Sequence, residues 1–426
     1  MTTEYVNSII KLDTVKHSPS YGSVAVLGDG RLLWVWGTGR GDPIDPVQGN
    51  YSEDEGASWN APADLKLETG GPMLAVMDAN LLRLKSGDLG LAMRSRAEIG
   101  AYEGDYHASL TFSRSADEGD TWSTPVQINP AGDDAVFTNE RSTVLKDGRI
   151  IVPFYTGLGA KPIGNEKILH RHGEEFGTAE RGGLSYSSAY YSDDDGRTWH
   201  RSRNEVYASI ENGNKGTFSM GEPAVIELDD GRILMLGRTN LGRFFQSYSD
   251  DRGETWNQAQ PTELACYPSP CKISRIPSTG DLLVIWNQIS SWETMNGLYR
   301  HRLSCAVSSD EGGTWRHHRN LESMDDTTYI EPGPIEVQPI GKMRQPVDRA
   351  RYHRAPAPLR YNQPTCTYLG EKVVITYGMC VFGDKAVVTD TYGMDYDKLM
   401  QSLGLAPFER GNRVRVMPTD WFYGGD

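Results

Sequence analysis

The segment GEPAVIELDDGRILMLGR places an acid and an arginine where both could act on one ligand. Glu222 lies nine residues before the turn glycine Gly231, and Arg238 lies seven residues after it. Antiparallel strands joined by a tight turn bring such positions to the same end of a hairpin. There a carboxylate could act as a general base, and a guanidinium could bind a planar carboxylate through two parallel hydrogen bonds.

Counting from the other turn glycines finds more polar side chains at the same end of the expected strands. Nine residues before a turn glycine stand Tyr21, Asp78, Asn139, Glu222 and Cys271, and beside Asn139 lie Glu140 and Arg141. Seven residues after a turn glycine stand Arg94, Tyr155, Arg238 and Asn287. The start of the expected third strand supplies His107, Arg243 and Arg302. Acids and arginines therefore converge on one rim, where His107 is either an ordinary strand histidine or a general base.

The stretch PLRYNQPTC contains a candidate nucleophile. If Gly370 is the pivot of its hairpin, Tyr361 takes the position that Glu222 has in its own hairpin. If Glu371 is the pivot, Asn362 or Gln363 takes that position instead. A tyrosine hydroxyl can act as a nucleophile when a neighbouring base activates it.

An octapeptide that recurs five times indicates which elements position these residues. The pattern S-x-D-x-G-x-S/T-W begins at residues 52, 115, 192, 249 and 308. In each copy, here called a box, Asp can accept backbone N–H groups across a turn, Gly can adopt positive φ, and Trp can pack between neighbouring units. A calcium loop would need more oxygen ligands and a closing Glu. The box is therefore expected to be a structural turn.

Each box follows two β-rich runs joined by a glycine turn, such as VIELDDGRILMLG, and a sixth copy, TCTYLGEKVVITYG, lacks the box. Each unit is thus a hairpin, a third strand, the box and a fourth strand. Six such units without helical periodicity predict an all-β fold, a six-bladed β-propeller of four-stranded antiparallel blades. The segment VNSIIKLD is expected to complete the last blade. Residues 1–426 would form a single domain with a third-blade insertion at about 157–183 and a long connection at about 317–360.

The composition of the chain limits the kinds of partner that it can be expected to bind. The chain of 426 residues has a formal charge of −14, which opposes nonspecific attraction to nucleic acids or anionic membranes. No apolar run approaches the roughly 20 residues that span a bilayer, and the start MTTEYVNSIIKLD lacks the features of a signal peptide. We therefore expect a soluble protein, cytoplasmic as given and secreted if a leader was removed.

The five cysteines lack metal-type spacing, so reduced thiols are expected, with a Cys266–Cys271 disulfide as the alternative. The one basic run, RQPVDRARYHRAPAPLR, could line a cleft for an anionic substrate or contact a second subunit of a homo-oligomer.

With five boxes at the spacing of propeller blades, the chain resembles the sialidase superfamily, whose six-bladed propellers carry such Asp boxes on the face opposite the active site. The resemblance implies that Glu222 is a base that polarises a tyrosine nucleophile, for which Tyr361 is the candidate. It implies that Arg238 grips the substrate carboxylate and that Arg302, which precedes the fifth box, is a second carboxylate-binding arginine. The acid/base aspartate of the family would lie in GTGRGDPIDPVQGN, where Asp45 is preferred over Asp42.

The chain departs from the sialidase pattern at the first arginine. The family has this arginine in an F/Y-R-I-P motif, whereas the corresponding stretch here is SYGSVAV, with Gly22 or Ser23 at that place. Three other arginines could replace this missing arginine and bind substrate together with Glu140. They are Arg141, Arg94 and Arg40.

These features predict a carbohydrate-active enzyme that cleaves the glycosidic bond of a terminal carboxylate-bearing sugar, with an acidic oligosaccharide as its partner. A sialidase-like exo-glycosidase, a hydrolase, is the first hypothesis. The second is a polysaccharide lyase that acts by β-elimination at a uronic acid, with His107 and a tyrosine moving protons. The third is a non-catalytic glycan-binding propeller, because Asp boxes also occur in such proteins. No cofactor or metal is required, and a structural cation remains open.

Overall fold

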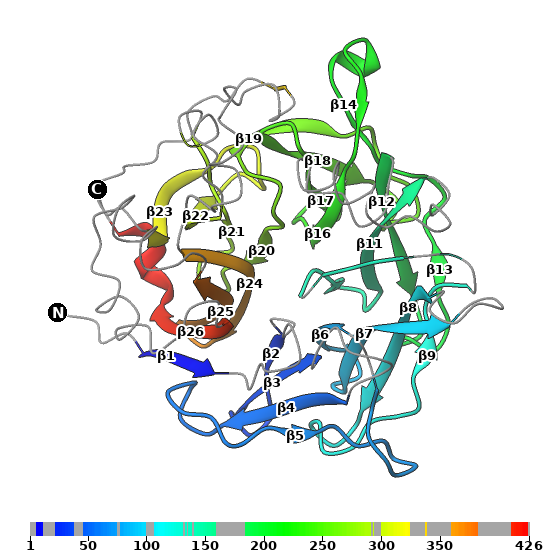
Figure 1. The fold of residues 1–426 in the computed structure, drawn as a ribbon, viewed down its shortest axis with the longest axis vertical. Coiled ribbons are helices and arrows are strands. Elements are labelled where there is room, and N and C mark those ends of the chain that lie inside the picture. Colours follow the sequence, from blue (N-terminus) through cyan, green and yellow to red (C-terminus); the bar gives the residue numbers. More distant parts are fainter. Residues whose placement is uncertain are drawn as a thin grey trace.

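The computed structural model describes residues 6–11, 22–37, 46–74, 77–98, 106–130, 133, 135–138, 140–158, 184–290, 293, 300–323, 337–338, 359–381 and 410–424. In this part of the chain, six four-stranded antiparallel sheets are arranged as blades around a central axis (Figure 1). The predicted six-bladed β-propeller is therefore confirmed.

The strands of each blade are given from the innermost outward. Blade one contains β2 (Ser23–Val26), β3 (Leu32–Gly37), β4 (Val47–Ser52) and β5 (Ala63–Asp64). Blade two contains β6 (Met77–Arg83), β7 (Leu89–Glu98), β8 (Tyr106–Ser115) and β9 (Val126–Gln127). Blade three contains β10 (Thr143–Val144), β11 (Ile150–Leu158), β12 (Leu184–Ser192) and β13 (His200–Arg201).

The other three blades follow the same order. Blade four contains β16 (Gly221–Glu227), β17 (Ile233–Arg238), β18 (Arg243–Ser249) and β19 (Gln260–Ala265). Blade five contains β20 (Lys272–Arg275), β21 (Leu282–Trp286), β22 (Arg302–Ser308) and β23 (Arg316–Ser323). Blade six contains β24 (Leu359–Leu369), β25 (Lys372–Val381), β26 (Arg410–Pro418) and β1 (Val6–Lys11).

Three smaller elements complete the described structure. A short hairpin of β14 (Ala208–Ser209) and β15 (Thr217–Phe218) projects from the ring and carries the 3-10 turn η2 (Glu211–Gly213) at its tip (Figure 1). A second 3-10 turn, η3 (Thr419–Tyr423), follows β26.

In three blades the second strand is mostly apolar and is buried along its whole length, without alternation between a buried and an exposed face. In β3, β17 and β21, with sequences LLWVWG, ILMLGR and LLVIW, every residue is buried. Both faces of such a strand pack against neighbouring blades, as when Leu33 and Val35 of blade one join Ala79 and Leu91 of blade two in one core cluster. Burial on both faces explains why these runs lack the period of two that a half-exposed strand would show.

The N-terminal strand closes the ring. β1 pairs with β26 over six consecutive residues, from Val6 opposite Val416 to Lys11 opposite Gly411. Blade six is therefore built from both ends of the chain, as expected from VNSIIKLD. Such closure leaves the sheet of the last blade with its full set of strands.

The boxes form the turns that the sequence predicts. In the first box, Asp54 Oδ1 accepts the backbone N–H of Ser58 at 2.7 Å, and Asp54 Oδ2 accepts the Ser58 hydroxyl at 2.6 Å. Gly56 has φ of 93°. The box tryptophans pack between blades, as Trp199 does against Phe112 of the preceding blade with ring centroids 5.3 Å apart.

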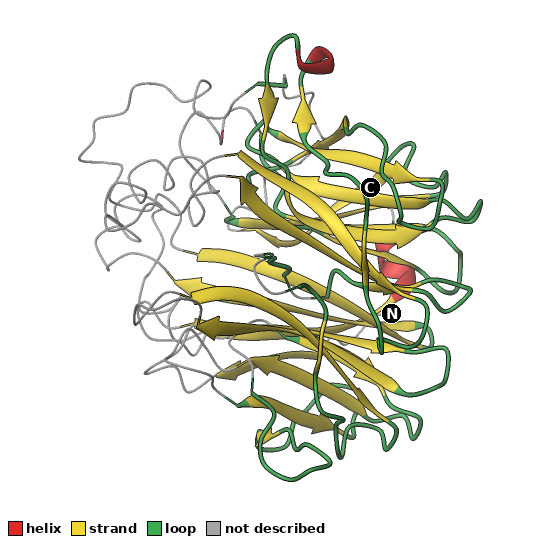
Figure 2. Cartoon of the chain, turned by 90° about the vertical axis from the view of Figure 1, so that its right-hand side faces the viewer, coloured by secondary structure: helices red, strands yellow, loops and turns green. Residues whose placement is uncertain are grey.

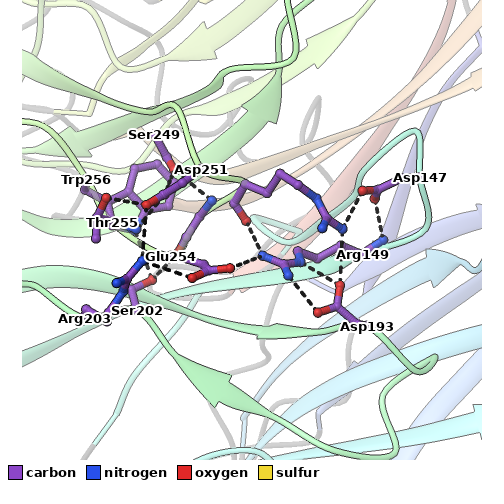
Figure 3. Close-up of polar contacts among 12 residues, drawn as sticks. Asp147, Arg149, Asp193, Ser202, Arg203, Ser249, Asp251, Glu254, Thr255 and Trp256 are labelled. Atoms are coloured by element: carbon purple, nitrogen blue, oxygen red, sulfur yellow. Dashed lines mark hydrogen bonds and ion pairs between the residues drawn. The ribbon is translucent and has the colours of Figure 1, made fainter.

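The strands of the blades run between two faces of the propeller (Figure 2). In each antiparallel blade that carries a box, the turn between the first and second strands and the box between the third and fourth lie at the same end, called the box face; the opposite ends form the upper face. Glu118 of the second box accepts the N–H of Gly28 from the hairpin of blade one at 2.9 Å and pairs with Arg83 at 2.7 Å. Within blade three, Arg149 pairs with Asp193 at 2.7 Å, and between blades three and four, Arg203 pairs with Glu254 at 3.1 Å (Figure 3). Ion pairs thus link neighbouring blades on the box face.

Two expected irregular regions are only partly described. Most of the insertion at 157–183 lies outside the described residues, although β11 extends to Leu158 and β12 begins at Leu184. The connection at 317–360 begins later than the sequence suggested, because residues 317–323 belong to β23. Among the described residues, no helix has the length and apolar character needed to cross a membrane.

Candidate active site on the upper face

The innermost strands share an unusual backbone feature at the upper face. Asp78, Glu140, Glu222 and Gln363 all have positive φ, between 43° and 51°. At three of them the strand register also shifts, as between Gly221 and Ala224, which marks a β-bulge. Positive φ is unfavourable for residues with a Cβ atom and tends to persist at functional sites. This conformation recurs in four blades and brings polar side chains to equivalent positions at the upper centre, which is therefore the candidate site.

Acid–arginine pairs occupy matching positions in two blades. Glu222 pairs with Arg238 in blade four at 2.9 Å, and Asp78 pairs with Arg94 in blade two at 2.8 Å. In both pairs the arginine follows the acid by sixteen residues, and all four side chains are mostly buried. The register count from the turn glycines therefore brought the correct residues together. Arg94, considered a replacement for the missing arginine, already has an acidic partner.

Arg141 crosses from blade three to blade six. Its side chain is 1% exposed, and its guanidinium donates to the carbonyl of Pro364 at 3.0 Å and to Gln363 Oε1 at 3.2 Å. Burial lowers the pKa of Arg141, and the charges of Glu140, Glu222 and others nearby oppose this shift. Arg141 is thus a buried cation under the centre of the upper face.

Glu140 lies beside Arg141 and is held from two other blades. Its carboxylate accepts the N–H of Cys366 at 2.9 Å, and Lys272 Nζ lies 3.6 Å from its other oxygen. Burial raises the pKa of Glu140, while Lys272 acts in the opposite direction. Through these contacts Glu140 links blade three to blades five and six.

Arg238 shares a hydrogen-bond acceptor with Arg300, a residue that was not predicted from the sequence. Arg238 Nη1 and Arg300 Nη2 both donate to the carbonyl oxygen of Pro268, at 3.4 and 3.3 Å. Arg300 also donates to Asn362 Oδ1 at 2.6 Å, and its carbonyl accepts the N–H of Tyr361 at 2.8 Å. Two arginines at the start of the third strand, in the sequence RHR, were the available signal, and spacing alone could not choose between them.

Arg302, the arginine that was chosen, lies in a different environment. Its guanidinium is buried and pairs with Glu293, and the same Glu293 oxygen lies 2.8 Å from His301 Nε2. Burial lowers the pKa of His301 to about 4, so the ring is neutral at pH 7. In the described residues Arg302 is therefore paired with an acid below the surface, whereas Arg300 reaches Arg238.

Gln363 occupies the blade-six position that corresponds to Glu222. Leu369 pairs with Lys372, so Gly370 and Glu371 together form the turn, and the bulge then falls at Gln363. Tyr361 instead packs its ring against Tyr377, with centroids 6.0 Å apart, and is 2% exposed within an apolar cluster. The geometry therefore favours Gln363 over Tyr361 at the place where the resemblance expected the nucleophile.

At Gly22, one of the two positions that correspond to the first arginine of the sialidase pattern, a side chain has no room. Gly22 has φ of 71°, and a Cβ atom added there would collide with the Trp34 indole and lie 2.6 Å from the Val35 carbonyl oxygen. Only glycine fits such a position without a shift of its neighbours.

The remaining candidates are outside the described part of the structure in whole or in part. His107 is on β8 opposite Ala97, but its side chain is not described. Arg40, Asp42 and Asp45 lie outside the described residues. Tyr155 belongs to β11 and is half-buried. Its ring lies 3.5 Å from the position that a Cβ atom on Gly221 would occupy.

The cysteines whose side chains the structure describes are reduced thiols, as first expected, and Cys266 and Cys271 form no disulfide. The four described cysteines, Cys266, Cys271, Cys305 and Cys366, are free and buried. Burial raises the pKa of Cys271 to about 12. Among the described residues, no group of three or more His, Cys, Asp or Glu side chains could hold a metal ion.

Comparisons with known proteins agree with this architecture. A family model described as "BNR repeat-like domain" matches residues 99–402. A protein of unknown function from Dyadobacter fermentans superposes with a TM-score of 0.61 at 16% identity, over 96% of this chain and 97% of that one. At these identities the likeness shows the fold alone.

Two sialidases are also similar in structure. The Hadza microbial sialidase Hz136 gives a TM-score of 0.57 at 16% identity, over 87% of this chain and 66% of that one. The Trypanosoma rangeli sialidase gives 0.52 at 16% identity, over 97% of this chain and 58% of that one. The chain thus spans less than two thirds of the length of either sialidase.

Proposed function

The chain belongs to the family of BNR repeat-like domains and has a sialidase-like propeller fold, and from this premise we propose that it cleaves the glycosidic bond of a terminal carboxylate-bearing sugar. The upper face would bind the acidic sugar at the end of an oligosaccharide. The substrate carboxylate would lie over blades four and five, where Arg238 and Arg300 meet.

The shared contact of Arg238 and Arg300 with Pro268 is the observation that supports this proposal. Two guanidinium groups that donate to one neutral carbonyl oxygen are close enough to repel each other. A carboxylate placed between them would relieve the repulsion and could accept hydrogen bonds from both. Such a site can bind an anion although the whole chain carries a charge of −14.

Charges around the upper centre support the same ligand. Three acids, Asp78, Glu140 and Glu222, share this region with five cationic side chains. The cations are Arg94, Arg141, Arg238, Lys272 and Arg300. Among these described side chains the cations outnumber the acids, and this local positive charge would attract an acidic sugar.

Hydrolysis would proceed without a tyrosine nucleophile, because Gln363 cannot replace one. Glu222 would take a proton from a water molecule, whose oxygen attacks the anomeric carbon as the glycosidic C–O bond breaks. The leaving oxygen would receive a proton from an acid, for which Asp45 remains the candidate by resemblance. Direct attack by water inverts the anomeric configuration.

Elimination at a uronic acid is the second candidate function, and the same Gln363 favours it, since elimination needs no nucleophile. A base would remove the proton next to the carboxylate, a C=C bond would form, and the C–O bond to the leaving sugar would break with a proton delivered to its oxygen. Tyr155, half-buried beside the strand that carries Glu222, is the described tyrosine that could supply this proton.

Product mass distinguishes these reactions. The protein would be incubated with sialosides and with uronate-terminated oligosaccharides in water enriched in oxygen-18, and the products would be analysed by mass spectrometry. Hydrolysis adds one labelled water, whereas elimination adds none and produces an unsaturated uronate that absorbs ultraviolet light. Cleavage restricted to glycans without a carboxylate would contradict the proposal, and binding without cleavage would favour a glycan-binding propeller.

A further inference from the structure

Glu293 lies under the upper face of blade five and has no role in the reaction described above. We propose that Glu293 is a positioning residue that holds Arg300 in place to bind the substrate carboxylate. This inference rests on the proposed function, because it assigns to Arg300 the role of a carboxylate-binding group. Glu293 would act through the backbone of residues 300–302 and would not touch the ligand.

Both oxygens of Glu293 are used by neighbouring groups. Oε1 accepts from Arg302 and lies 2.8 Å from His301 Nε2, which can donate to it in the Nε2–H tautomer of the neutral ring. Oε2 accepts the backbone N–H of Ser290 at 2.6 Å, and the N–H of Glu293 donates to Ser290 Oγ at 3.2 Å. The carboxylate is thus fixed at one end to its own turn and at the other to residues 301 and 302.

Arg300 directly precedes these two anchored residues and has a strained backbone. Its φ is 55°, a left-handed value that is unfavourable for arginine. The Arg302 carbonyl accepts from Asn287 Nδ2 at 2.7 Å, and the same amide group donates to the Tyr361 carbonyl at 3.1 Å. The described contacts that anchor this strained segment lie on the C-terminal side of Arg300, and Glu293 takes part in those of His301 and Arg302.

The arrangement also separates two neighbouring arginines by function. Arg302 is buried against a carboxylate, so its charge is balanced inside the protein. Arg300 is half-buried, and in the described residues its guanidinium donates to two neutral oxygens, Asn362 Oδ1 and the Pro268 carbonyl. Because neither of these acceptors carries a negative charge, Arg300 is, of the two arginines, the one placed to respond to an anionic ligand.

Loss of the Glu293 charge would disturb Arg300 indirectly. A buried cation that loses its counter-charge is destabilised and moves toward water when it can. If Arg302 moved outward, the backbone of residues 300–302 would move with it, and Arg300 would lose the geometry that brings it to Pro268. The expected consequence is weaker binding of carboxylated sugars without loss of the fold.

The test compares four variants by calorimetric titration with glucuronate and N-acetylneuraminate. We expect Glu293→Gln to weaken binding about tenfold, and Arg300→Ala to weaken it at least as much. The double variant should bind no more weakly than Arg300→Ala alone, since a residue that acts through Arg300 has no further effect once Arg300 is gone. Glu311→Gln is the matched control: Glu311 holds Arg275 at 2.7 Å on the box face, so binding should be unchanged.

A crystal structure of Glu293→Gln provides a readout that does not depend on the ligand. We expect Arg300 to leave Asn362 and Pro268 in this variant. If Arg300 keeps both contacts, or if the effects of Glu293→Gln and Arg300→Ala simply add, the positioning role is wrong. If Arg300→Ala and the wild type bind both sugars equally, or neither protein binds them, the proposed function fails, while the crystal structure still decides whether Glu293 positions Arg300.

Discussion

Arg238 and Arg300 come from different blades and donate to the same oxygen atom, the carbonyl of Pro268, at 3.4 and 3.3 Å. Arg238 has an acidic partner in Glu222, and Arg300 has a neutral partner in Asn362. In the described residues the two guanidinium groups therefore form one local positive site, in which Glu222 pairs with Arg238. Such a site has the chemistry to bind a further carboxylate from a ligand.

Replacing Arg238 by lysine should weaken carboxylate binding although the charge is kept. Lysine offers a point charge and cannot form the planar pair of hydrogen bonds that arginine forms with a carboxylate. We expect kcat/KM for a carboxylated substrate to fall roughly tenfold to a hundredfold. The measurement is steady-state kinetics, with Arg232→Lys on the box face as the control. Equal kinetics for Arg238→Lys and wild type would show that Arg238 does not touch the carboxylate.

Replacing Glu222 by glutamine should separate binding from turnover. The variant removes a negative charge beside the ligand carboxylate, so binding should stay the same or become tighter. Removal of a general base should lower kcat by about a hundredfold or more. Asp78→Asn is the matched variant, because Asp78 forms the equivalent pair with Arg94 in blade two. A similar loss of kcat in both variants would argue against a special role for Glu222.

The boxes should make stability depend on pH in the acidic range. The side-chain and backbone hydrogen bonds from Ser58 hold the pKa of Asp54 below its ordinary value of 3.8. A carboxylate with a lowered folded-state pKa stabilises the protein fully above its unfolded pKa and loses this effect as pH falls through the folded pKa. The difference in Tm between wild type and Asp54→Asn should therefore be largest near neutral pH and shrink below about pH 4. A difference that stays constant down to pH 2 would contradict this account.

The buried thiols should resist alkylation in the folded protein. Burial raises the pKa values of Cys271 and Cys305 to about 12 and that of Cys366 to about 11. At pH 8 only about one Cys271 side chain in ten thousand would be the reactive thiolate. Peptide mass analysis after iodoacetamide treatment should find these three cysteines unlabelled without denaturant and labelled in urea. Rapid labelling of Cys271 in the native protein would show that its surroundings open to solvent.

Much of the fold was predictable because each blade repeats its own local signals. The boxes and the glycine turns set the length of each unit, and the turn glycines set the register within the first hairpin. Counting from Gly87 and Gly231 was enough to pair Asp78 with Arg94 and Glu222 with Arg238. Here local geometry decides which side chains meet.

The parts that could not be predicted depend on bulges and on contacts between distant segments. In blade six, the short turn at Gly370 and Glu371, together with a bulge, shifts the central position from Tyr361 to Gln363. A one-residue or two-residue shift of this kind changes which face a side chain takes.

The choice between Arg300 and Arg302 has a similar cause. Both precede the same box, and Arg302 pairs with Glu293, which lies nine residues before it in a non-repeating segment. No spacing rule relates that segment to the propeller repeat.

The most direct test of the central claim is to measure the affinity of the wild-type protein for an acidic sugar and for its carboxamide, which differ only in the charged group. We predict that glucuronate or N-acetylneuraminate binds at least about tenfold more tightly than the matching carboxamide, because Arg238 and Arg300 require an anion. Equal affinity for the acid and the amide, or the absence of binding to either acid, would contradict the account.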